Sequence, residues 1–498
     1  MDRKRLKKKF FSSYWLILVL GMMFLLRLPL LFEPFTYADE GIYLTLGQAL
    51  RKGLVLYRDI HDNKPPMLYL IAALGENFTA YRLIHFFWSF ATIFIFYKLS
   101  QFLFSKNKRA IIISTSVFAI LTSLHTFESN IANAENFMIL PIITAFYLIL
   151  PEISQNHFGK RWFAAGVLFS LAVLFKVPAI FDFAAAIVLL FLIDQKRSTS
   201  STIQSLVFSL LGFLLPIFIT ILYFASQNAL PQYLSTAFSQ NLPYLSSWGG
   251  SNVKMGGLPL ILIGRALIVF LIVILLFLFR KNFSLTAKLV ITWFSFSLFA
   301  ALLSSRPYPH YLIQVLPSFS LAFGFFAFDK IKKWLKSIPV FLGLTFVLTF
   351  ISFRFWYYPN LPYLVNFYQF AFGIKSRQDY FSNFDKQALS LYEAAAFIKT
   401  HTSPQEKIFI WGTEPSIYAL SHRLPVGRYT VSYHIIDFNG YQETMMALTN
   451  NPPRWLIKTQ DEKTPFPQLQ EFIEDNYVPF QQMGKMEIFY RLPKISRL

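Results

Sequence analysis

Two carboxylates follow closely on the first long apolar run of the chain. Asp39 and Glu40 come a few residues after the run at 13 to 32, at the start of a loop that extends to residue 81. A carboxyl group near apolar surface has a raised pKa unless a cation or hydrogen bonds compensate. A raised pKa suits a general base near neutral pH. The pair therefore indicates acid–base chemistry at this point of the chain.

A structural explanation of the same pair stands beside the catalytic one. Asp39 is also suited to cap an interfacial helix running from about Gly41 to Lys52, because its side-chain oxygen accepts hydrogen bonds from the first N–H groups of a helix. The apolar face of that helix would consist of Ile42, Leu46 and Leu50.

Four basic residues occur at other breaks between apolar runs. Lys64 precedes two prolines, whose fixed backbone makes a stiff support for its ammonium group. Arg306 and His310 lie between the ninth and tenth runs, where a guanidinium offers planar bidentate donors to phosphate oxygens. Lys176, between the fifth and sixth runs, is a further candidate cation. Snorkelling is the alternative for Lys64, and interfacial anchoring for Arg306 and His310.

The composition shows what kind of protein holds these residues. Of 498 residues, 55% are hydrophobic and only 14% charged, with a net charge of +20, whereas soluble chains carry about 25% charged residues. Lys and Arg form short clusters between apolar runs instead of one polar face, which argues against nucleic-acid binding. The chain has no cysteine, which excludes disulfides, thiolate metal sites and cysteine nucleophiles.

Eleven apolar runs are candidates for membrane-spanning helices, each of which needs about 20 mostly apolar residues. The runs lie near residues 13–32, 82–104, 110–126, 137–151, 162–176, 179–193, 205–226, 258–280, 287–303, 311–328 and 337–353. They predict a polytopic α-helical membrane protein.

Short basic clusters predict the orientation of these spans. The chain begins with a basic segment at residues 3 to 9, and every second loop after it is basic as well, which places all of them in the cytoplasm. The clusters are Arg3, Lys4, Arg5, Lys7, Lys8 and Lys9; Lys106, Lys108 and Arg109; Lys160 and Arg161; Lys196 and Arg197; Arg280 and Lys281; and Lys330, Lys332, Lys333 and Lys336. The C-terminus and the loops at 33–81 and 227–257 then lie outside. A cleaved signal peptide at 13–32 is disfavoured, because the run is long and no small-residue cleavage site follows it.

The most polar stretch of the chain, residues 354–498, predicts a small extracytoplasmic α/β domain after a transmembrane domain at 1–353. Strands are expected at 407–411, 455–458 and 487–491, and helices at 392–400, 414–421 and 469–476. Aromatic residues of this domain either form its core or stack on a ligand. For Phe409 and Trp411, in a predicted strand, we favour the core.

The Asp-Glu pair after the first span, with Lys-Pro-Pro further along the same loop, resembles the GT-C-fold glycosyltransferases that use polyprenyl-phosphate sugars. That group includes protein O-mannosyltransferases and lipid A aminoarabinose transferases. The resemblance implies a GT-C membrane domain with Asp39 as the catalytic base and Lys64 near the donor phosphate. The outward Arg306-x-x-x-His310 segment is also similar.

A second acidic residue often precedes the fourth span in such proteins, and Glu135 matches it. The resemblance implies that Glu135 binds the acceptor, acts as a second base or holds a metal. The alternative is a helix N-terminal glutamate stabilised by the helix dipole. The sequence around Lys64 and the compact C-terminal domain depart from both named subgroups, so the identity of the acceptor does not carry over.

The predicted reaction moves a hexosyl or pentosyl group from a polyprenyl-phosphate donor to an envelope or secreted acceptor. It would take place on the outer face of the bacterial cytoplasmic membrane. Asp39 would deprotonate an acceptor hydroxyl, whose in-line attack inverts the anomeric carbon. Glu40 and Glu135 complete the acidic set, and the growing phosphate charge would be stabilised by Lys64 with Arg306, His310 or Lys176.

The motifs identify no cofactor. The sequence has neither an ATP-binding glycine loop nor a dinucleotide fingerprint. A divalent metal ion held by His61, Asp62, Asp39 and Glu135 is an alternative on which the prediction does not depend.

The main rival function is a transporter or lipid flippase. Carriers tend to show internal repeats and polar sites near the membrane midplane, whereas these ionisable residues gather on one outer face. A non-catalytic scaffold or receptor would not need the acidic pair and Lys-Pro-Pro.

Overall fold

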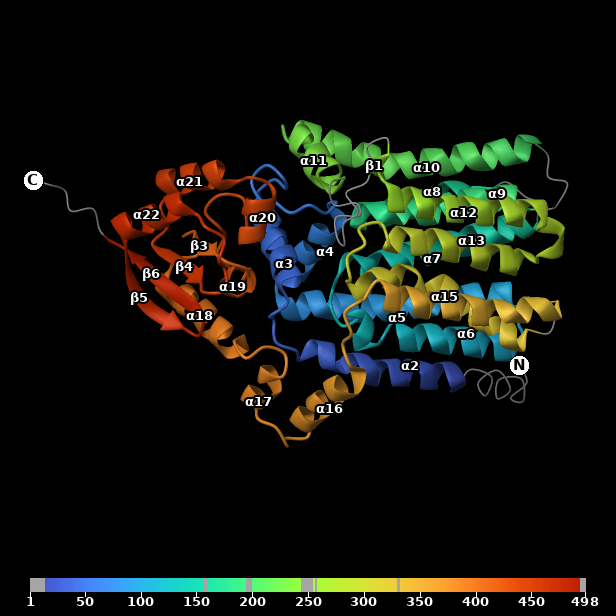
Figure 1. Ribbon diagram of the computed structural model, residues 1–498, viewed down its shortest axis with the longest axis horizontal. Coiled ribbons are helices and arrows are strands. Elements are labelled where there is room, and N and C mark those ends of the chain that lie inside the picture. Colours follow the sequence, from blue (N-terminus) through green and yellow to red (C-terminus); the bar gives the residue numbers. More distant parts are fainter. Residues whose placement is uncertain are drawn as a thin grey trace, which may run out of the picture. The chain divides into compact units, whose positions relative to one another are not determined.

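The computed structural model describes residues 14–155, 159–193, 199–242, 254–255, 258–328 and 332–492. The chain forms two compact units (Figure 1). The first, called here the helical unit, comprises Met1–Pro29, His85–Tyr223 and Gln240–Tyr363. The second, the sheet unit, comprises Leu30–Ile84, Phe224–Ser239 and Leu364–Leu498. This grouping joins the loop at 33–81 to the C-terminal residues, whereas the prediction divided the chain once, at residue 353.

Long helices make up the helical unit and lie side by side in Figure 1. Their bounds are α2 Tyr14–Arg27, α5 Phe78–Leu103, α6 Lys108–Leu121, α7 Ala134–Ser154, α8 Arg161–Phe175, α9 Ile180–Phe191, α10 Thr199–Ser226, α12 Leu260–Leu278, α13 Leu285–Ala301, α14 Leu316–Phe323 and α15 Ile338–Ser352. Two short strands, β1 Lys254–Met255 and β2 Leu258–Pro259, pair before α12. Helix α16, Asn360–Ala371, follows α15.

Each of the eleven apolar runs coincides with one of these helices, so the prediction that each run is helical is confirmed. In the described residues, six helices, some lengthened by an adjoining 3-10 turn, are long and apolar enough to cross a membrane: 14–31, 78–103, 134–154, 199–226, 260–278 and 333–352. The number of spans stays a prediction. Helix α12 leaves large apolar side chains such as Leu267, Phe270 and Leu278 exposed, as expected of a helix whose surroundings are lipid.

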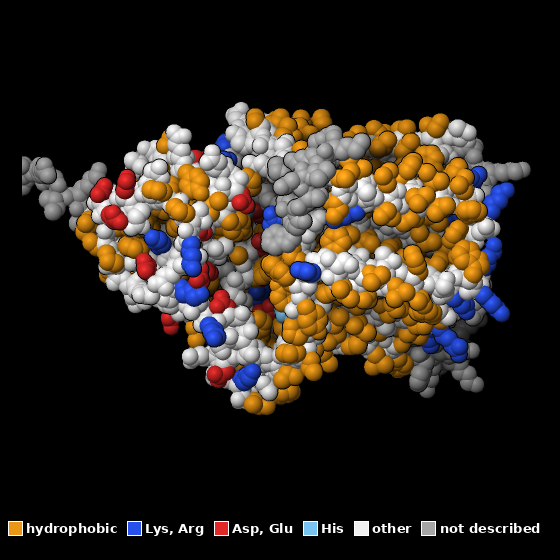
Figure 2. All heavy atoms as spheres, in the orientation of Figure 1, with side chains coloured by type: hydrophobic (Ala, Val, Ile, Leu, Met, Phe, Trp, Pro, Cys, Tyr) orange, Lys and Arg blue, Asp and Glu red, His pale blue; other side chains and the backbone are white. Residues whose placement is uncertain are grey.

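Basic side chains gather at one end of the helices, while apolar side chains cover their flanks (Figure 2). The connections at that end carry Lys106, Lys108, Arg109, Lys160, Arg161, Arg280, Lys281, Lys332, Lys333 and Lys336. The other basic residues of the predicted pattern, at 3 to 9, 196, 197 and 330, lie outside the described residues. The orientation of the termini across the membrane stays a prediction.

A four-stranded sheet with order β3-β4-β6-β5 forms the centre of the sheet unit. Its strands are β3 Phe409–Trp411, β4 Trp455–Thr459, β5 Tyr477–Met483 and β6 Met486–Arg491, of which only β3 and β4 pair in parallel. The helices are α3 Ala38–Arg51, α4 Met67–Gly75, α11 Leu230–Ala237, α17 Arg377–Ser382, α18 Ala388–His401, α19 Ser416–Ser421, α20 Ser432–Asp437, α21 Tyr441–Asn450 and α22 Pro467–Asn476. The three predicted strands and three predicted helices are confirmed, whereas β5, α20 and α21 were missed.

Side chains alternate across the sheet and fill a core on each face. Ile410, Ile457 and Ile488 pack with α18 on one face. Phe409, Trp411 and Leu456 pack with α21 and α22 on the other. Because successive residues of a strand point to opposite faces, both faces need apolar residues. Phe409 and Trp411 therefore belong to the core, as predicted.

Helix α3 is enclosed within the sheet unit, so the expectation of a one-sided interfacial helix is wrong. Residues 40 to 49 are all buried. A Cβ on Gly47 would come within 2.6 Å of the backbone of Ala72 in α4, and one on Gly41 within 2.7 Å of Ser416 in α19. These two glycines let the neighbouring helices approach from both sides, which an apolar pattern alone does not reveal.

Candidate functional site

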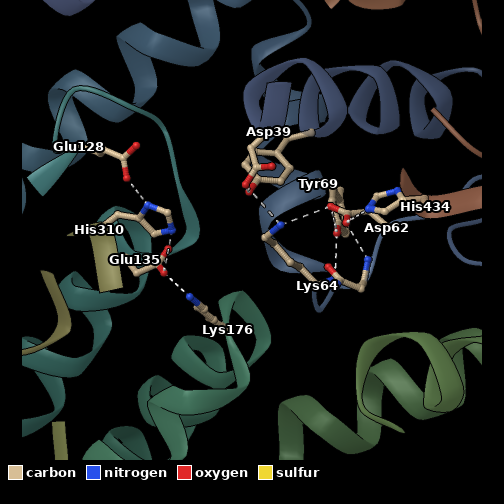
Figure 3. Close-up of polar contacts among 11 residues, drawn as sticks. Asp39, Asp62, Lys64, Tyr69, Glu128, Glu135, Lys176, His310 and His434 are labelled. Atoms are coloured by element: carbon tan, nitrogen blue, oxygen red, sulfur yellow. Dashed lines mark hydrogen bonds and ion pairs between the residues drawn. The ribbon is translucent and has the colours of Figure 1, made fainter. Parts of the chain in front are cut away.

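Asp39 and Lys64 face each other in the sheet unit. Helix α3 begins at Ala38 with Tyr37 as its N-cap residue. Asp39 therefore lies in the first turn of α3 and does not cap it. Its carboxylate accepts a hydrogen bond of 2.7 Å from the hydroxyl of Tyr43, one turn later, and stands 3.6 Å from Lys64 Nζ (Figure 3). The two side chains are 29% and 23% exposed. Both are held in place, and both are open to a substrate.

Lys64 is positioned by groups on three sides. Its ammonium group lies 3.8 Å from Asp62 and 4.8 Å above the ring of Tyr43. Its carbonyl accepts a hydrogen bond of 2.9 Å from the hydroxyl of Tyr57. Pro65 and Pro66 separate Lys64 from the start of α4 at Met67. The stiff Lys-Pro-Pro support expected from the sequence is therefore anchored at both ends.

Asp62 is the buried carboxylate behind Lys64, with a side chain only 1% exposed. It accepts hydrogen bonds from the hydroxyl of Tyr69, at 2.8 Å, and from the N–H of Asn63, at 2.7 Å. Burial opposes its ionisation, but Lys64, His434 and these two donors outweigh burial and hold the pKa of Asp62 below its usual value. Asp62 is therefore charged at neutral pH and serves as a fixed counter-ion for Lys64.

His434 and His61 form the next layer behind Asp62. His434 Nε2 lies 3.6 Å from Asp62, and the ring of His61 lies edge-on to His434, Tyr429 and Phe438. In the described part of the chain, neither nitrogen of the His61 ring has a hydrogen-bond partner. Burial, then the neighbouring His434 and Arg428, lowers the pKa of His61 well below its usual value. Burial also lowers the pKa of His434, against the opposing charge of Asp62.

These lowered pKa values predict acid lability of the sheet unit. Below about pH 6.5 both histidines take up protons in the unfolded chain, whereas in the folded unit they stay neutral to lower pH. The contribution of these histidines to the free energy of unfolding is therefore complete above that pH and decreases as the pH falls. Each histidine accounts for up to about 1.4 kcal/mol per pH unit. Replacing His61 with Phe should flatten the fall measured by thermal unfolding at pH 7, 6 and 5. Replacing the exposed His401 with Gln should leave it unchanged, and an equal effect of the two variants would contradict the assignment.

Glu40 points away from Asp39 into the interior of the unit. Adjacent residues of a helix project about 100° apart, and Glu40, with no exposed surface, pairs with Arg82 at 2.6 Å. Arg82 also donates to the carbonyl groups of Leu30, at 3.1 Å, and Glu33, at 2.8 Å. This buried network joins the start of α5 to the segment before α3. This geometry favours a structural role for Glu40, and the catalytic role predicted from the sequence stays a prediction.

A second charged cluster lies in the helical unit. Glu135, the second residue of α7, forms an ion pair with Lys176, the C-cap residue that follows α8. His310 lies between two carboxylates, with Nδ1 bonded to Glu128 and Nε2 at 3.8 Å from Glu135 (Figure 3). The structure thus brings three predicted site residues together and adds Glu128. Because Lys176 and His310 already face carboxylates, the cluster is not a free pair of cations.

Tyr311 and Arg306 border this second cluster along the chain. Lys176 Nζ lies 3.7 Å from the centre of the Tyr311 ring, in a cation–π contact. Arg306 is half-buried, and its N–H donates to Ser304 Oγ at 3.3 Å. The predicted role of Arg306 in binding phosphate stays a prediction.

Asp182 fixes the segment that carries His310. It lies wholly buried in α9 and accepts hydrogen bonds of 2.6 Å from the indole of Trp293 and from the amide of Gln314. Gln314 also donates to the carbonyl of Pro178, at 3.2 Å. Since Gln314 ends the 3-10 turn Pro309–Gln314 and Pro178 follows Lys176, the network ties the two cationic segments together.

Several of these residues were not assigned their observed roles from the sequence. Asp62 was named only as part of the alternative metal set, although it stands two residues before Lys64. Tyr43 was missed, although its spacing of four from Asp39 was a signal. Glu128, Asp182 and His434 had none, because each meets its partners through the tertiary fold. In the described residues, no group of three or more His, Asp and Glu is arranged to hold a metal ion, so the alternative metal set around His61 is not assembled there.

The sequence and the structure were compared with those of known proteins. Residues 63–224 match the family described as dolichyl-phosphate-mannose-protein mannosyltransferase. ArnT from Cupriavidus metallidurans bound to undecaprenyl phosphate matches with a TM-score of 0.58 and 12% identity, over 97% of this chain and 99% of that chain. The apo state of the same protein matches with a TM-score of 0.57 and 12% identity, over 97% and 98%. No curated protein matches in sequence.

A weaker similarity, with a TM-score of 0.48 and 12% identity, links the chain to the oligosaccharyltransferase of Archaeoglobus fulgidus, over 98% of this chain and 74% of that chain. That score is too low to establish a common fold. The match to ArnT, which spans nearly the full length of both chains, shows that this protein has the GT-C fold of membrane glycosyltransferases. The predicted fold class is therefore confirmed.

Proposed function

We propose that the protein is an integral-membrane glycosyltransferase that moves a sugar from a polyprenyl-phosphate donor to an acceptor outside the cytoplasmic membrane of a bacterium. The observation that carries the proposal is the partly exposed Asp39–Lys64 pair, with 3.6 Å between carboxylate and ammonium. The family match over residues 63–224, which begins one residue before Lys64, and the undecaprenyl phosphate bound by ArnT support a lipid-phosphate donor.

In this proposal Asp39 takes the proton from the acceptor hydroxyl, which then attacks the anomeric carbon. The bond from that carbon to the phosphate oxygen breaks on the opposite face, so the configuration inverts and polyprenyl phosphate leaves. Lys64 stabilises the negative charge that grows on the leaving phosphate. Asp62, charged and buried, keeps the ammonium group of Lys64 in place.

The helical unit has its own part in the proposal. Glu135 and Glu128 hold Lys176 and His310, and these four groups offer both acceptors and donors to a polar substrate. Glu135 remains the candidate for acceptor binding. Donor phosphate contact by Arg306, His310 and Lys176 is retained as the sequence-based prediction. For Lys176 and His310 it requires exchange of a carboxylate partner for the phosphate.

A single assay on the purified protein tests this function. The protein is mixed with a polyprenyl-phosphate sugar carrying a radioactive sugar and with solubilised envelope material, and free polyprenyl phosphate is measured. The enzyme releases it in step with labelled acceptor. A lipid flippase would move the donor across vesicle membranes without cleaving it, and that result would overturn the proposal.

A further inference from the structure

One edge of the β-sheet collects three basic side chains. Lys407 lies two residues before β3, Arg454 immediately precedes β4, and Arg491 is the last residue of β6. Strands β3 and β4 run parallel and β6 runs opposite to them, so these three chain positions meet at the same edge. The N–H of Arg491 donates to the carbonyl of Arg454 at 3.0 Å, which places those two residues side by side.

The three residues line a surface hollow of about 760 Å³, called here the basic groove. That volume falls within the range of about 300 to 1,000 Å³ that is usual for ligand pockets. Gln405 and Asn451 add amide groups to the lining, and Tyr490 adds a partly exposed ring. Asp39 and Lys64 are not among the lining residues, so the groove is distinct from the candidate catalytic pair.

The basic side chains of the groove lack a direct carboxylate partner in the part of the chain that the structure describes, although Lys407 lies near enough to Asp59 to help lower the pKa of that carboxyl group. Within the described residues, none of Lys407, Arg454 and Arg491 forms a salt bridge with a carboxylate, while Lys485, at the opposite edge of the sheet, pairs with Asp461 at 2.8 Å. The one acid in the lining, Glu406, accepts a hydrogen bond from the N–H of Ser403. Gathering like charges in a concavity costs free energy, and an anionic ligand would offset that cost.

The backbone connects the groove to the candidate catalytic loop. Val426 lines the groove, and two residues later the carbonyl of Arg428 accepts a hydrogen bond of 2.9 Å from the N–H of His61. His61 immediately precedes Asp62, the counter-ion of Lys64. A ligand in the groove is thus held by the same unit that carries Asp39 and Lys64.

We propose that the basic groove binds an anionic stretch of a polysaccharide acceptor, one that carries phosphate or carboxylate groups. This inference rests on the proposed glycosyltransferase function and specifies its acceptor class. Arginine binds both kinds of anion through paired N–H donors, and amides with an aromatic ring suit the hydroxyls and faces of sugars. A concave site fits a chain of sugars better than it fits a flat lipid surface.

The test compares two full-length variants with equal net charge. Lys407→Gln with Arg454→Gln removes two groove cations, and Lys386→Gln with Lys463→Gln removes two exposed cations of the sheet unit outside the groove. The probes are a glycerol-phosphate oligomer, a uronic-acid oligomer and neutral dextran, with binding to detergent-solubilised protein measured by calorimetry. We expect the groove variant to bind both anionic probes at least tenfold more weakly, the control within twofold of the unaltered protein, and dextran to bind none of the three.

Equal binding of the anionic probes by both variants would overturn the proposal. So would a tenfold preference of the groove for dihexanoyl phosphatidylglycerol, because its partner would then be a lipid headgroup. Donor cleavage with a small neutral acceptor should be unchanged in the groove variant, while the KM for an anionic polymer rises and kcat stays. If the unaltered protein cleaves no donor yet binds the probes through the groove, the enzyme assignment fails and the groove assignment stands.

Discussion

Replacing Asp39 with Asn should reduce kcat for sugar transfer by a factor of about 10² to 10⁴, the range that a positioned general base contributes. Asn keeps an oxygen that can accept the hydrogen bond from Tyr43 and has nearly the same size, but it cannot take the acceptor proton. Lys64 keeps its second counter-ion, Asp62. Donor affinity and the melting temperature should therefore stay close to those of the unaltered protein.

The measurement is release of polyprenyl phosphate under single-turnover conditions, which separates chemistry from product release. Asp59→Asn is a matched control, since Asp59 belongs to the same loop but faces Arg58 at 2.8 Å at the surface. It should retain most activity. Turnover in the Asp39 variant within twofold of the unaltered protein would remove Asp39 as the base, and a large loss of donor binding would move its role to the donor.

Local patterns in the sequence predicted most elements of the fold. Apolar runs of spanning length can form only helices in lipid, since every backbone N–H and C=O must be satisfied within the segment. The strands predicted at 455–458 and 487–491 coincide with β4 and β6. Strand β5 was missed because five of its seven residues, from Val478 to Gln482, are exposed and leave no buried face in the pattern. The position of β5 in the sheet is determined by its antiparallel pairing with β6.

In the sheet unit, the sequence named the candidate site mainly where its residues belong to one loop. The Lys64–Asp39 contact joins two motifs of that loop. Of the two buried residues behind Lys64, Asp62 lies close to it in the sequence, whereas His434 belongs to the C-terminal residues. Local sequence patterns could therefore indicate Asp62 but not His434. Enclosure of α3 had no signal either. Gly41 and Gly47 lie within the predicted helix, and only the tertiary fold shows that they allow the close approach of α19 and α4.

Glu40→Gln should destabilise the sheet unit by about 3 kcal/mol, the lower end of the cost of leaving one partner of a buried ion pair alone. Arg82 would keep its bonds to the carbonyl groups of Leu30 and Glu33, which limits the loss. Arg51→Gln is the control, because the Arg51–Glu76 pair is about half exposed on both sides and exposed pairs contribute at most about 1 kcal/mol. Thermal unfolding of the detergent-solubilised protein measures both.

Stability and turnover together distinguish the two carboxylates of the pair. If the geometry assigns them correctly, Asp39→Asn loses turnover and keeps its melting temperature, while Glu40→Gln loses stability and, below its melting temperature, still turns over. The reason is that Glu40 has no exposed surface through which to reach a substrate, whereas Asp39 is 29% exposed. A Glu40 variant that melts like the unaltered protein but transfers no sugar would instead make Glu40 catalytic, as the sequence pattern alone suggested.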